Sequence, residues 1–355
     1  MKIVKIRAWE ENFNLSRPYT IAFRSIFEVQ NIFIEIESDN GLIGHGCGSP
    51  EHHVTGETFS MCLAALNESL FTKLKAFDFA AQWTQVQAML QTELANTPAA
   101  RAAVDIALHD LHAKAARMPL YAWLGGQNRR LETSITIGIK PLAEVLSEAD
   151  EYLQRGFKVI KLKLGKDLES DIERTLCLRE RVGSDIRIRV DLNQGYTLLQ
   201  LKSYFDRTSN AQIEFLEQPL HTTLFDQVAT LSKARKLQIA ADESLLTPND
   251  AVNLAAHDLC GIFNIKLMKC GGIFPALAIA NTAATHKIDL MWGCMDESRI
   301  SIAAALHAAF ACQNTQYLDL DGHLDLARDL FVGGFELNDG FMQATSTPGL
   351  GCHFS

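Results

Sequence analysis

The sequence predicts an α/β protein in which an α+β domain of residues 1–125 precedes a parallel β/α barrel of residues 126–319. Two observations lead to this fold class. From about residue 131 on, apolar stretches of strand length alternate with stretches of helix length. In addition, five of these apolar stretches end in a charged residue, and the charged residues recur every 24 to 28 residues. That interval fits one strand, one helix and two short loops.

The first domain begins with strand-like segments. Residues 2–10 and 31–37 are predicted strands, and Asp39-Asn40-Gly41 is a hairpin turn that leads into a third strand at 42–47. The polar stretch 12–30 is too long for a tight hairpin, and we expect a loop of functional importance there.

Three helices follow, and they are predicted at 56–71, 78–92 and 97–117. The third helix starts with Thr97-Pro98, a capping residue followed by a proline at the first helical position. Gly125-Gly126 marks the expected boundary of the first domain.

The second part contains eight predicted strands, at 132–137, 157–164, 186–191, 211–217, 237–242, 261–266, 288–293 and 315–319. Seven helices are predicted between them, at 142–155, 168–182, 197–209, 222–235, 248–257, 273–287 and 298–311. A closed parallel barrel is the natural arrangement of these elements, and an open doubly wound sheet is the alternative. Residues 320–355 contain glycine and proline turns and are expected to fold back and complete the first domain.

Composition limits the function classes. The chain has 355 residues, of which 47% are hydrophobic and 21% are charged, and its formal net charge is −9. This charge argues against nucleic acid or an anionic membrane surface as a partner. No apolar run is long enough to span a membrane, and residues 1–7 alternate like a strand instead of resembling a signal peptide. The eight cysteines are scattered without a C-x-x-C pair, so we expect reduced thiols in a cytoplasmic protein, with a zinc site as the alternative.

The stretch of residues 157–164 carries two cations at the end of an apolar strand. Side chains two residues apart lie on the same face of a strand, so Lys161 and Lys163 point the same way. A short apolar strand does not normally carry two cations on one face unless something there uses them.

Carboxylates occupy the ends of the next three strands, and a lysine ends the following one: Asp191, Glu217, Asp242 and Lys266. In a barrel these strand ends converge on the mouth, where enzymes of this fold carry their chemistry. Three converging carboxylates repel one another, and a hard divalent cation such as Mg²⁺ resolves that repulsion. The alternative is that each acid pairs with a neighbouring lysine in a structural network. Asn193 and Gln194 either support these carboxylates or are plain loop residues.

Lysines near a metal site suggest proton transfer. The second and sixth strands of a barrel lie on opposite sides of the mouth, so Lys163 and Lys266 can flank a substrate on its two faces. Nearby cations and partial burial are expected to lower the pKa of one of them. The metal and Lys161 then hold a substrate carboxylate while its α-proton leaves and an enediolate forms. A Schiff-base lysine enzyme, such as an aldolase, is the alternative chemistry.

Several motifs together resemble the muconate-lactonising-enzyme subgroup of the enolase superfamily, and the similarity covers essentially the whole chain. The motifs are Lys161-x-Lys163, Asp191-Leu192-Asn193-Gln194-Gly195, Glu217-Gln218-Pro219, Asp242-Glu243-Ser244, the stretch from Asn264 to Gly272, and residues 102–110. The resemblance implies a modified TIM barrel, (β/α)7β, with an N-terminal α+β capping domain. It also implies catalysis by Lys163 and Lys266, with Mg²⁺ on Asp191, Glu217 and Asp242.

Within that subgroup, Asp319-Leu320-Asp321 is similar to the D-x-D motif of dipeptide epimerases. Two acids on one face of a strand end can hold a substrate ammonium by charge-assisted hydrogen bonds, although an aspartate pair before a glycine also suits a turn. Thr136, Cys294 and Asp296 match positions that contact the peptide in such epimerases, or else they simply line the barrel mouth.

The expected substrate is L-Ala-D/L-Glu, because Arg24 matches an arginine that pairs with the glutamate side chain in the resembled epimerases. Asp296 and Glu51-His52-His53 point instead to a neutral or cationic residue. The resemblance thus implies a Mg²⁺-dependent isomerase that inverts the Cα of the C-terminal residue of a dipeptide. Cycloisomerisation of a muconate, o-succinylbenzoate synthesis and N-acylamino-acid racemisation are alternatives within the subgroup. Homo-oligomers are usual in this family.

Overall fold

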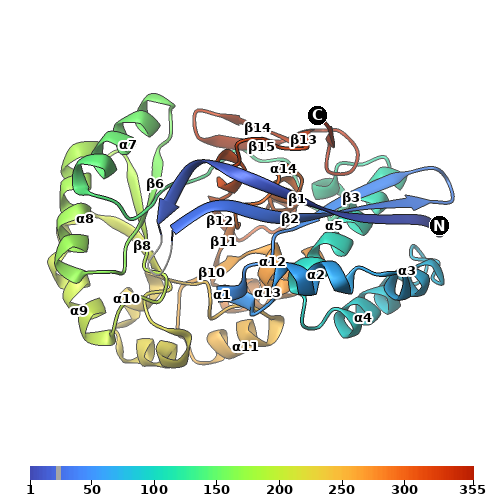
Figure 1. Cartoon of the computed structure of the whole chain (residues 1–355). Coiled ribbons are helices and arrows are strands. Elements are labelled where there is room, and N and C mark those ends of the chain that lie inside the picture. The colour runs from blue at the N-terminus through green and yellow to red at the C-terminus, as the bar shows by residue number, and fades with distance from the viewer. Residues whose placement is uncertain (21–24) are drawn as a thin grey trace.

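The computed structural model describes residues 1–20 and 25–355, and it consists of a capping domain on a barrel (Figure 1). The cap contains an antiparallel sheet of β1 (Ile3–Thr20), β2 (Ser25–Ser38) and β3 (Ile43–Gly48), in that order. Helix α5 (Pro98–Ala115) packs on β3. Glycines occupy every second position of β3 that faces α5, at 44, 46 and 48, because a Cβ there would collide with backbone oxygens of the helix.

The described residues of the polar stretch 12–30 form strands, so the prediction of a loop there was wrong for residues 12–20 and 25–30. Strand β1 continues to Thr20 and β2 begins at Ser25, with Asn12 opposite Gln30 and Asn14 opposite Glu28. Phe13 and Leu15 are buried, whereas the polar residues between them face solvent. A two-residue alternation was therefore present in the sequence, but its apolar positions are too few to stand out.

The remaining elements of the cap are short. They are α1 (His52–Thr55), α2 (Phe59–Ala65), α3 (Glu68–Lys75), α4 (Trp83–Glu93) and α6 (Leu120–Trp123). The helix predicted at 56–71 is divided in two because Asn67 starts a new helix: its side chain accepts hydrogen bonds from the backbone N–H groups of Ser69 and Leu70.

The barrel has eight parallel strands in sequential order: β5 (Ile135–Ile137), β6 (Val159–Lys163), β7 (Arg187–Asp191), β8 (Ile213–Glu217), β9 (Ile239–Ala241), β10 (Ile262–Ile265), β11 (Asp289–Gly293) and β12 (Thr315–Asp319). The backbone N–H of Ser134 donates to Leu318 O at 3.1 Å, which brings the first and last strands together. The predicted α/β barrel class is confirmed.

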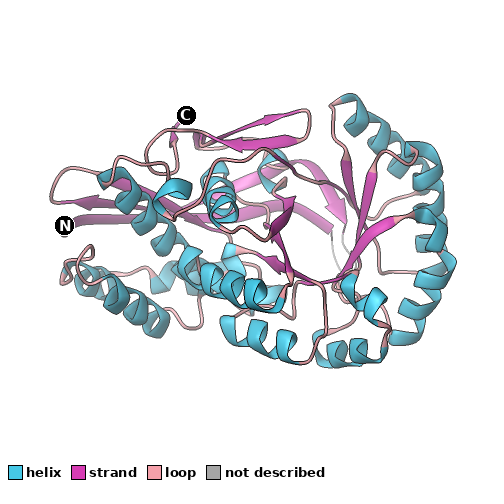
Figure 2. Ribbon diagram, turned by 180° about the vertical axis from the view of Figure 1, so that it is seen from behind, coloured by secondary structure: helices cyan, strands magenta, loops and turns pink. Residues whose placement is uncertain are grey.

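Helices surround these strands on the outside (Figure 2). They are α7 (Leu142–Gln154), α8 (Leu168–Val182), α9 (Leu198–Arg207), α10 (Lys233–Leu237), α11 (Pro248–Ala256), α12 (Leu267–Cys270), α13 (Ile273–His286) and α14 (Arg299–Ala311). The helix predicted at 222–235 is instead a 3₁₀ segment, η2 (Thr222–Thr230), followed by α10. A further 3₁₀ turn, η1 (Ser209–Ala211), precedes β8.

The C-terminal segment touches both parts of the molecule. Its elements are η3 (Gly322–Leu324), β13 (Phe331–Gly333), β14 (Phe335–Asn338), β15 (Phe341–Ala344) and β16 (Cys352–Phe354). The rings of Phe331 and Phe354 stack on Phe33 and Trp9 of the cap sheet. Strand β15 pairs with β4 (Leu131–Glu132), so the strand predicted at 132–137 is two separate strands. The domain boundaries at 125 and 319 stay predictions.

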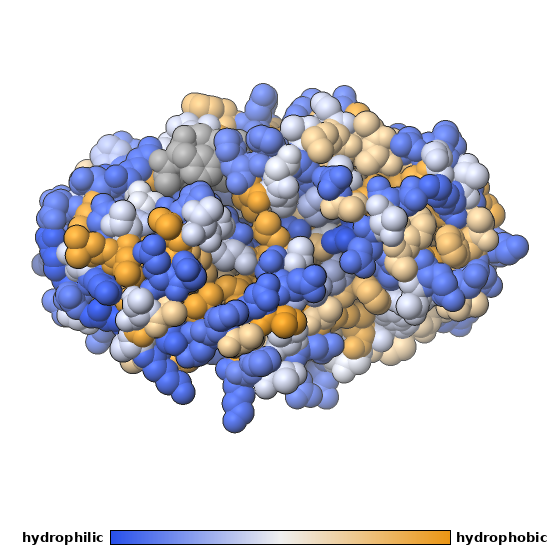
Figure 3. Space-filling model, turned by 90° about the horizontal axis from the view of Figure 1, so that it is seen from below, coloured by the Kyte–Doolittle hydropathy of each residue, from blue (hydrophilic) through white to orange (hydrophobic). Residues whose placement is uncertain are grey.

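Three further properties of the chain bear on the predictions made from composition. No helix among residues 1–20 and 25–355 is long and apolar enough to cross a membrane. All eight cysteines are free. On the face seen in Figure 3, hydrophobic residues occur in separate groups among hydrophilic ones.

Candidate active site

The charged strand ends lie side by side at the carboxyl end of the barrel. Lys163 of β6 is in register with Asp191 of β7, which is in register with Glu217 of β8. Asp242 directly follows β9, and Lys266 directly follows β10. We call these residues together with Lys161 the floor; its members are Lys161, Lys163, Asp191, Glu217, Asp242 and Lys266. A cavity of about 400 Å³ opens above the floor.

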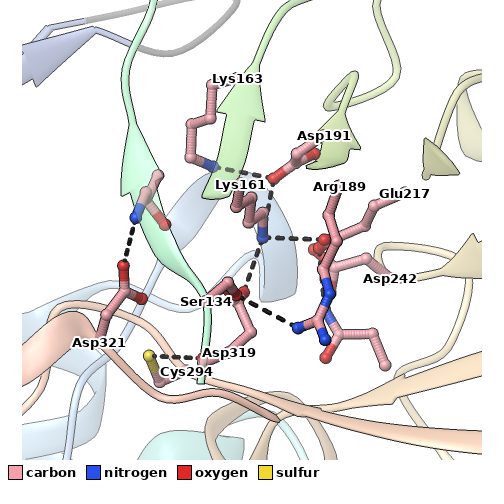
Figure 4. A network of polar contacts seen from close by, with 12 residues as sticks. Ser134, Lys161, Lys163, Arg189, Asp191, Glu217, Asp242, Cys294, Asp319 and Asp321 are labelled. Atoms are coloured by element: carbon pink, nitrogen blue, oxygen red, sulfur yellow. Dashed lines mark hydrogen bonds and ion pairs between the residues drawn. The ribbon is translucent and has the colours of Figure 1, made fainter. Parts of the chain in front are cut away.

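Lys161 occupies the centre of the floor (Figure 4). Its Nζ lies 2.8 Å from Glu217 Oε2, 2.8 Å from Asp319 Oδ2 and 3.2 Å from Asp191 Oδ2. Burial alone would lower the pKa of Lys161, but the charges of Asp191 and the other two carboxylates raise it well above its usual value. Lys161 is therefore a fixed ammonium group, which suits the binding of an anion and not the removal of a proton.

Lys163 and Lys266 both line the cavity. Their strands, β6 and β10, are separated in the sheet by β7, β8 and β9. Lys163 Nζ lies 2.9 Å from Asp191 Oδ2, and Lys266 Nζ lies 2.8 Å from Asp242 Oδ2. The structure thus brings together the two lysines that the sequence proposed as an acid/base pair, on opposite sides of one mouth.

The lowered pKa expected for one lysine of the pair is not found at Lys266. Burial lowers its pKa, but the charges of Asp242 and Glu217 outweigh burial, and the result is a pKa above the usual value.

The floor carboxylates contact ammonium groups in this structure. Among the described residues, no three His, Cys, Asp or Glu side chains form a group that could hold a metal as they stand. The donors nevertheless fit Mg²⁺, because Asp191, Glu217 and Asp242 supply only oxygens and come from three neighbouring strand ends. Glu217 Oε2 is buried and contacts the ammonium of Lys161 at 2.8 Å, so one positive charge already lies where a metal ligand is expected.

Like charges shape the titration of this group. Burial and then the charge of Asp191 raise the pKa of Glu217 to about 8. Burial also opposes ionisation of Asp191, but Lys161 and Lys163 overcome it and lower the pKa of Asp191 to about 2. Asp191, beside two lysines, is thus the stronger acid, whereas the single ammonium of Lys161 does not outweigh burial and the charge of Asp191 at Glu217.

Side chains that the sequence analysis missed or left undecided hold the floor in place. Asn193 accepts a hydrogen bond from Lys163 Nζ at 3.2 Å and so supports the floor. This agrees with one of the two alternatives that the sequence left open for this residue. The Oε1 atom of Gln218 accepts from the backbone N–H of Asp242, and Asn264 donates to Glu217 Oε1 at 2.8 Å. Asn193 and Gln218 have positive φ angles of 38° and 35°, which non-glycine residues rarely adopt outside constrained sites. The signal available in the sequence was that Asn193 and Gln218 follow the floor residues Asp191 and Glu217 within two positions.

Most of the predicted substrate-binding residues line the cavity: Thr136, Lys161, Cys294, Asp296, Asp319 and Asp321. Asp319 is occupied by Lys161 and by Ser134 Oγ at 2.5 Å, whereas Asp321 Oδ2 accepts the backbone N–H of Thr136 at 2.7 Å. Cys294 Sγ contacts the backbone oxygen of Asp319 at 3.2 Å. The predicted contact of Arg24 lies outside the described residues.

Acidic side chains from four other segments complete the cavity. Glu28 comes from the cap hairpin, Glu51 follows β3, Asp296 follows β11 and Asp325 follows η3. We call these four residues the acidic wall. Arg17 and Lys140 also line the cavity, and both contact Glu148. The cavity is thus lined by acids well beyond the three that suit a metal.

Comparison with known families agrees with this geometry. Residues 3–125 match the mandelate racemase/muconate lactonizing enzyme N-terminal domain, and residues 144–355 match the enolase C-terminal domain-like family. The chain belongs to this family of the enolase superfamily. Within it, the chain groups with dipeptide epimerases, which are isomerases.

Particular relatives are similar over their full length. The L-Lys-D/L-Arg epimerase of Desulforapulum autotrophicum is 52% identical, with 99% of each chain covered. A crystal structure of a dipeptide epimerase from Methylococcus capsulatus, complexed with Mg and L-Arg-D-Lys, is 52% identical and superimposes with a TM-score of 0.97 over 100% of both chains. The L-Ala-D/L-Glu epimerase of Bacillus subtilis, in a substrate-liganded structure, is 32% identical with a TM-score of 0.95 over 99% of both chains.

Proposed function

We propose that the protein is a Mg²⁺-dependent dipeptide epimerase whose substrates carry lysine or arginine side chains. The observation that carries the reaction type is the placement of Lys163 and Lys266 on opposite sides of one cavity above three carboxylates. The observation that carries the substrate class is the acidic wall. The 52% identical relatives named for lysine and arginine dipeptides support the same choice.

The fixed ammonium of Lys161 holds the carboxylate of the C-terminal residue at the base of the cavity. The α-carbon next to that carboxylate then lies between Lys163 and Lys266. One lysine removes the α-proton, and the other returns a proton to the opposite face, which inverts the configuration. Because the two ammonium groups lie on different strands, each serves one face of the α-carbon, and both substrate epimers are accepted.

Asp191, Glu217 and Asp242 would hold Mg²⁺, which supplies positive charge for the negative charge that develops on the substrate carboxylate. The side chains of Asn193, Gln218 and Asn264 keep the site in shape through the hydrogen bonds described above.

Asp321 binds the free ammonium of the N-terminal residue. One of its oxygens is fixed by the backbone N–H of Thr136, and the second can accept from the substrate. Asp319 lies beside it and orients Lys161, since its own carboxylate spans Lys161 and Ser134. Substrates without an ammonium, as in cycloisomerisation, o-succinylbenzoate synthesis or N-acylamino-acid racemisation, would leave Asp321 without its partner.

Charge distinguishes cationic dipeptides from L-Ala-D/L-Glu. A glutamate side chain would enter a cavity with four acids on its wall, whereas a lysine or arginine side chain is attracted there. Arg17 and Lys140 offer little to a substrate carboxylate because Glu148 already engages both. L-Ala-D/L-Glu, favoured in the sequence analysis through Arg24, is the second candidate.

Incubation of the enzyme and MgCl₂ in D₂O with L-Lys-L-Arg, L-Arg-L-Lys and L-Ala-L-Glu tests the proposal. Epimerisation of the first two, with one α-deuterium gained in the C-terminal residue by mass spectrometry, is the expected result. EDTA should stop the exchange. In addition, Mg²⁺ should raise the melting temperature of the enzyme but not that of the Asp191→Asn variant. Exchange that persists in EDTA contradicts the metal role, and a preference for L-Ala-L-Glu contradicts the substrate class.

A cytoplasmic location and a homo-oligomer stay predictions. Borohydride trapping of a lysine adduct would support the Schiff-base alternative instead.

A further inference from the structure

Two acids that follow β12 lie one turn apart and both line the cavity. They are Asp321 and Asp325, and η3 joins them. Leu324 N donates to Asp321 O at 2.8 Å, and Asp325 N donates to Gly322 O at 3.4 Å. These are the i→i+3 hydrogen bonds of a 3₁₀ turn, so the backbone holds Asp325 close to Asp321, and both side chains line the same cavity.

The two carboxylates have different surroundings. Asp321 is held by the backbone N–H of Thr136. In the part of the chain that the structure describes, the carboxylate of Asp325 has no hydrogen bond or ion pair among the observed contacts. Its backbone is nevertheless fixed, because Asp325 O accepts from Ser16 N at 2.7 Å and Ala327 N donates to Asn14 O at 2.9 Å. A carboxyl group without a described partner thus stands on a backbone that is held to the cap hairpin by hydrogen bonds.

The potential at Asp325 is strongly negative. Burial, followed by the charges of Asp296, Asp321 and Glu148, raises the pKa of Asp325 to about 9. Lys163 is the cation that opposes this effect, and it belongs to the floor. Arg17 and Lys140 contact Glu148 on the same side of the cavity. A cation placed here would offset the repulsion among these carboxylates.

We propose that Asp325 is a specificity-determining residue that binds the side-chain ammonium or guanidinium of the N-terminal residue of the dipeptide. This inference rests on the proposed epimerase function. It assigns the N-terminal side chain, and not the C-terminal one, to Asp325.

Reach supports the assignment. When the substrate ammonium lies on Asp321, the α-carbon of the N-terminal residue is one bond away. The side chain that leaves this carbon needs to cover about one turn to meet Asp325, a span that suits the four-carbon stem of lysine. The C-terminal residue, in contrast, has its α-carbon between Lys163 and Lys266, and its side chain begins one dipeptide unit further from Asp321.

The test compares L-Lys-L-Ala with L-Ala-L-Lys, which carry the same charge on different residues. In the Asp325→Asn variant, kcat/KM for L-Lys-L-Ala divided by kcat/KM for L-Ala-L-Lys should fall about 10- to 100-fold. The fall should come mainly from a higher KM for L-Lys-L-Ala, since a charged hydrogen bond is lost. Asp289→Asn, the same change at the amino-terminal end of β11, should leave the ratio unaltered. An unaltered ratio in Asp325→Asn, or a loss that follows the C-terminal lysine, overturns the proposal.

Asp325→Glu gives an independent readout that retains the charge. Because its carboxylate extends one methylene further into the cavity, the variant should prefer L-ornithyl-L-alanine over L-Lys-L-Ala relative to the wild type. No shift in that preference also counts against the proposal. If the wild type epimerises no dipeptide at all, the proposed function fails; an active wild type with unshifted ratios removes the role of Asp325 alone.

Discussion

The floor and the acidic wall enclose one cavity, but they are built differently. Floor residues stand at the ends of adjacent parallel strands, and each of its ammonium groups contacts a carboxylate. Wall residues come from the cap hairpin and from three loops that are far apart in the sequence. At Asp325, burial and then the charges of neighbouring acids raise the pKa.

This difference separates reaction from selectivity. The barrel fixes the geometry of the floor through strand register, and a change of substrate does not require a change there. The wall can vary without disturbing the sheet, because loops tolerate substitution better than strands. The reaction type is therefore expected to be common to relatives that share the floor, whereas side-chain preference depends on the wall.

The largest effect is expected from breaking the floor. Lys163→Ala and Lys266→Ala should each lower kcat by about 10²- to 10⁴-fold, because each removes the acid/base group for one face of the α-carbon. Each variant should still exchange the α-proton of one epimer in D₂O, and the two variants should differ in which epimer that is. NMR of the pure L,L and L,D dipeptides measures this directly.

Lys166→Ala is the matched control, since this lysine is exposed on the loop after β6. It should retain full activity. If both floor variants exchange the same epimer, the two lysines do not serve opposite faces, and the proposed division of roles is wrong.

The floor could be predicted from the sequence because strands impose simple rules. Lys161 and Lys163 share a face by the two-residue alternation, and regular spacing aligned Asp191, Glu217, Asp242 and Lys266 at one end of the sheet. Whether cations or carboxylates dominate the pKa of each lysine could not be predicted, since this depends on distances between strands. At Lys266 the carboxylates dominate and raise the pKa.

The wall was predicted in part. Asp296 was identified through a family resemblance and Glu51 as a residue that can reach the pocket, but Asp325 and Glu28 had no local signal. Their positions depend on the hairpin of β1 and β2, which the sequence analysis treated as a loop. Contacts between the cap and the barrel join residues hundreds of positions apart, and neither alternation nor spacing predicts them.

A second prediction tests how the cap holds the wall. Asn31 of β2 is fully buried; its Oδ1 accepts from Ser298 N at 2.9 Å, and its Nδ2 donates to Asp296 O at 3.2 Å. Asn31→Ala leaves Ser298 N without a partner and leaves Asp296 O with Ser49 Oγ alone, and it should lower the free energy of unfolding by about 2 kcal/mol. Because the loop that carries Asp296 loosens, KM for cationic dipeptides should rise more than kcat falls.

Urea denaturation and steady-state kinetics measure the two effects. Asn12→Ala, which removes an exposed amide of the same hairpin, is the control and should change neither. A variant at Asn31 that is destabilised but keeps its KM would show that Asn31 supports the fold without shaping the wall.

The smallest effect, and the one that separates wall from floor most clearly, is on stability. Asp325 has its folded pKa raised to about 9, so the native state binds a proton that the unfolded state releases near pH 4. The native state then binds more protons than the unfolded state between these values, and wild-type stability falls as pH rises through this window. Asp325→Asn removes this cost.

The variant should therefore match the wild type near pH 4 and be more stable by about 1 kcal/mol or more at pH 8, since one pKa unit corresponds to about 1.4 kcal/mol. Urea unfolding at pH 4, 6 and 8 measures the difference. Substitution of a floor carboxylate such as Asp191, which contacts two lysines, should destabilise the protein instead. A gain in stability at Asp325 together with a loss of selectivity for an N-terminal lysine would mean that the wall holds its charge for the substrate at the expense of the fold.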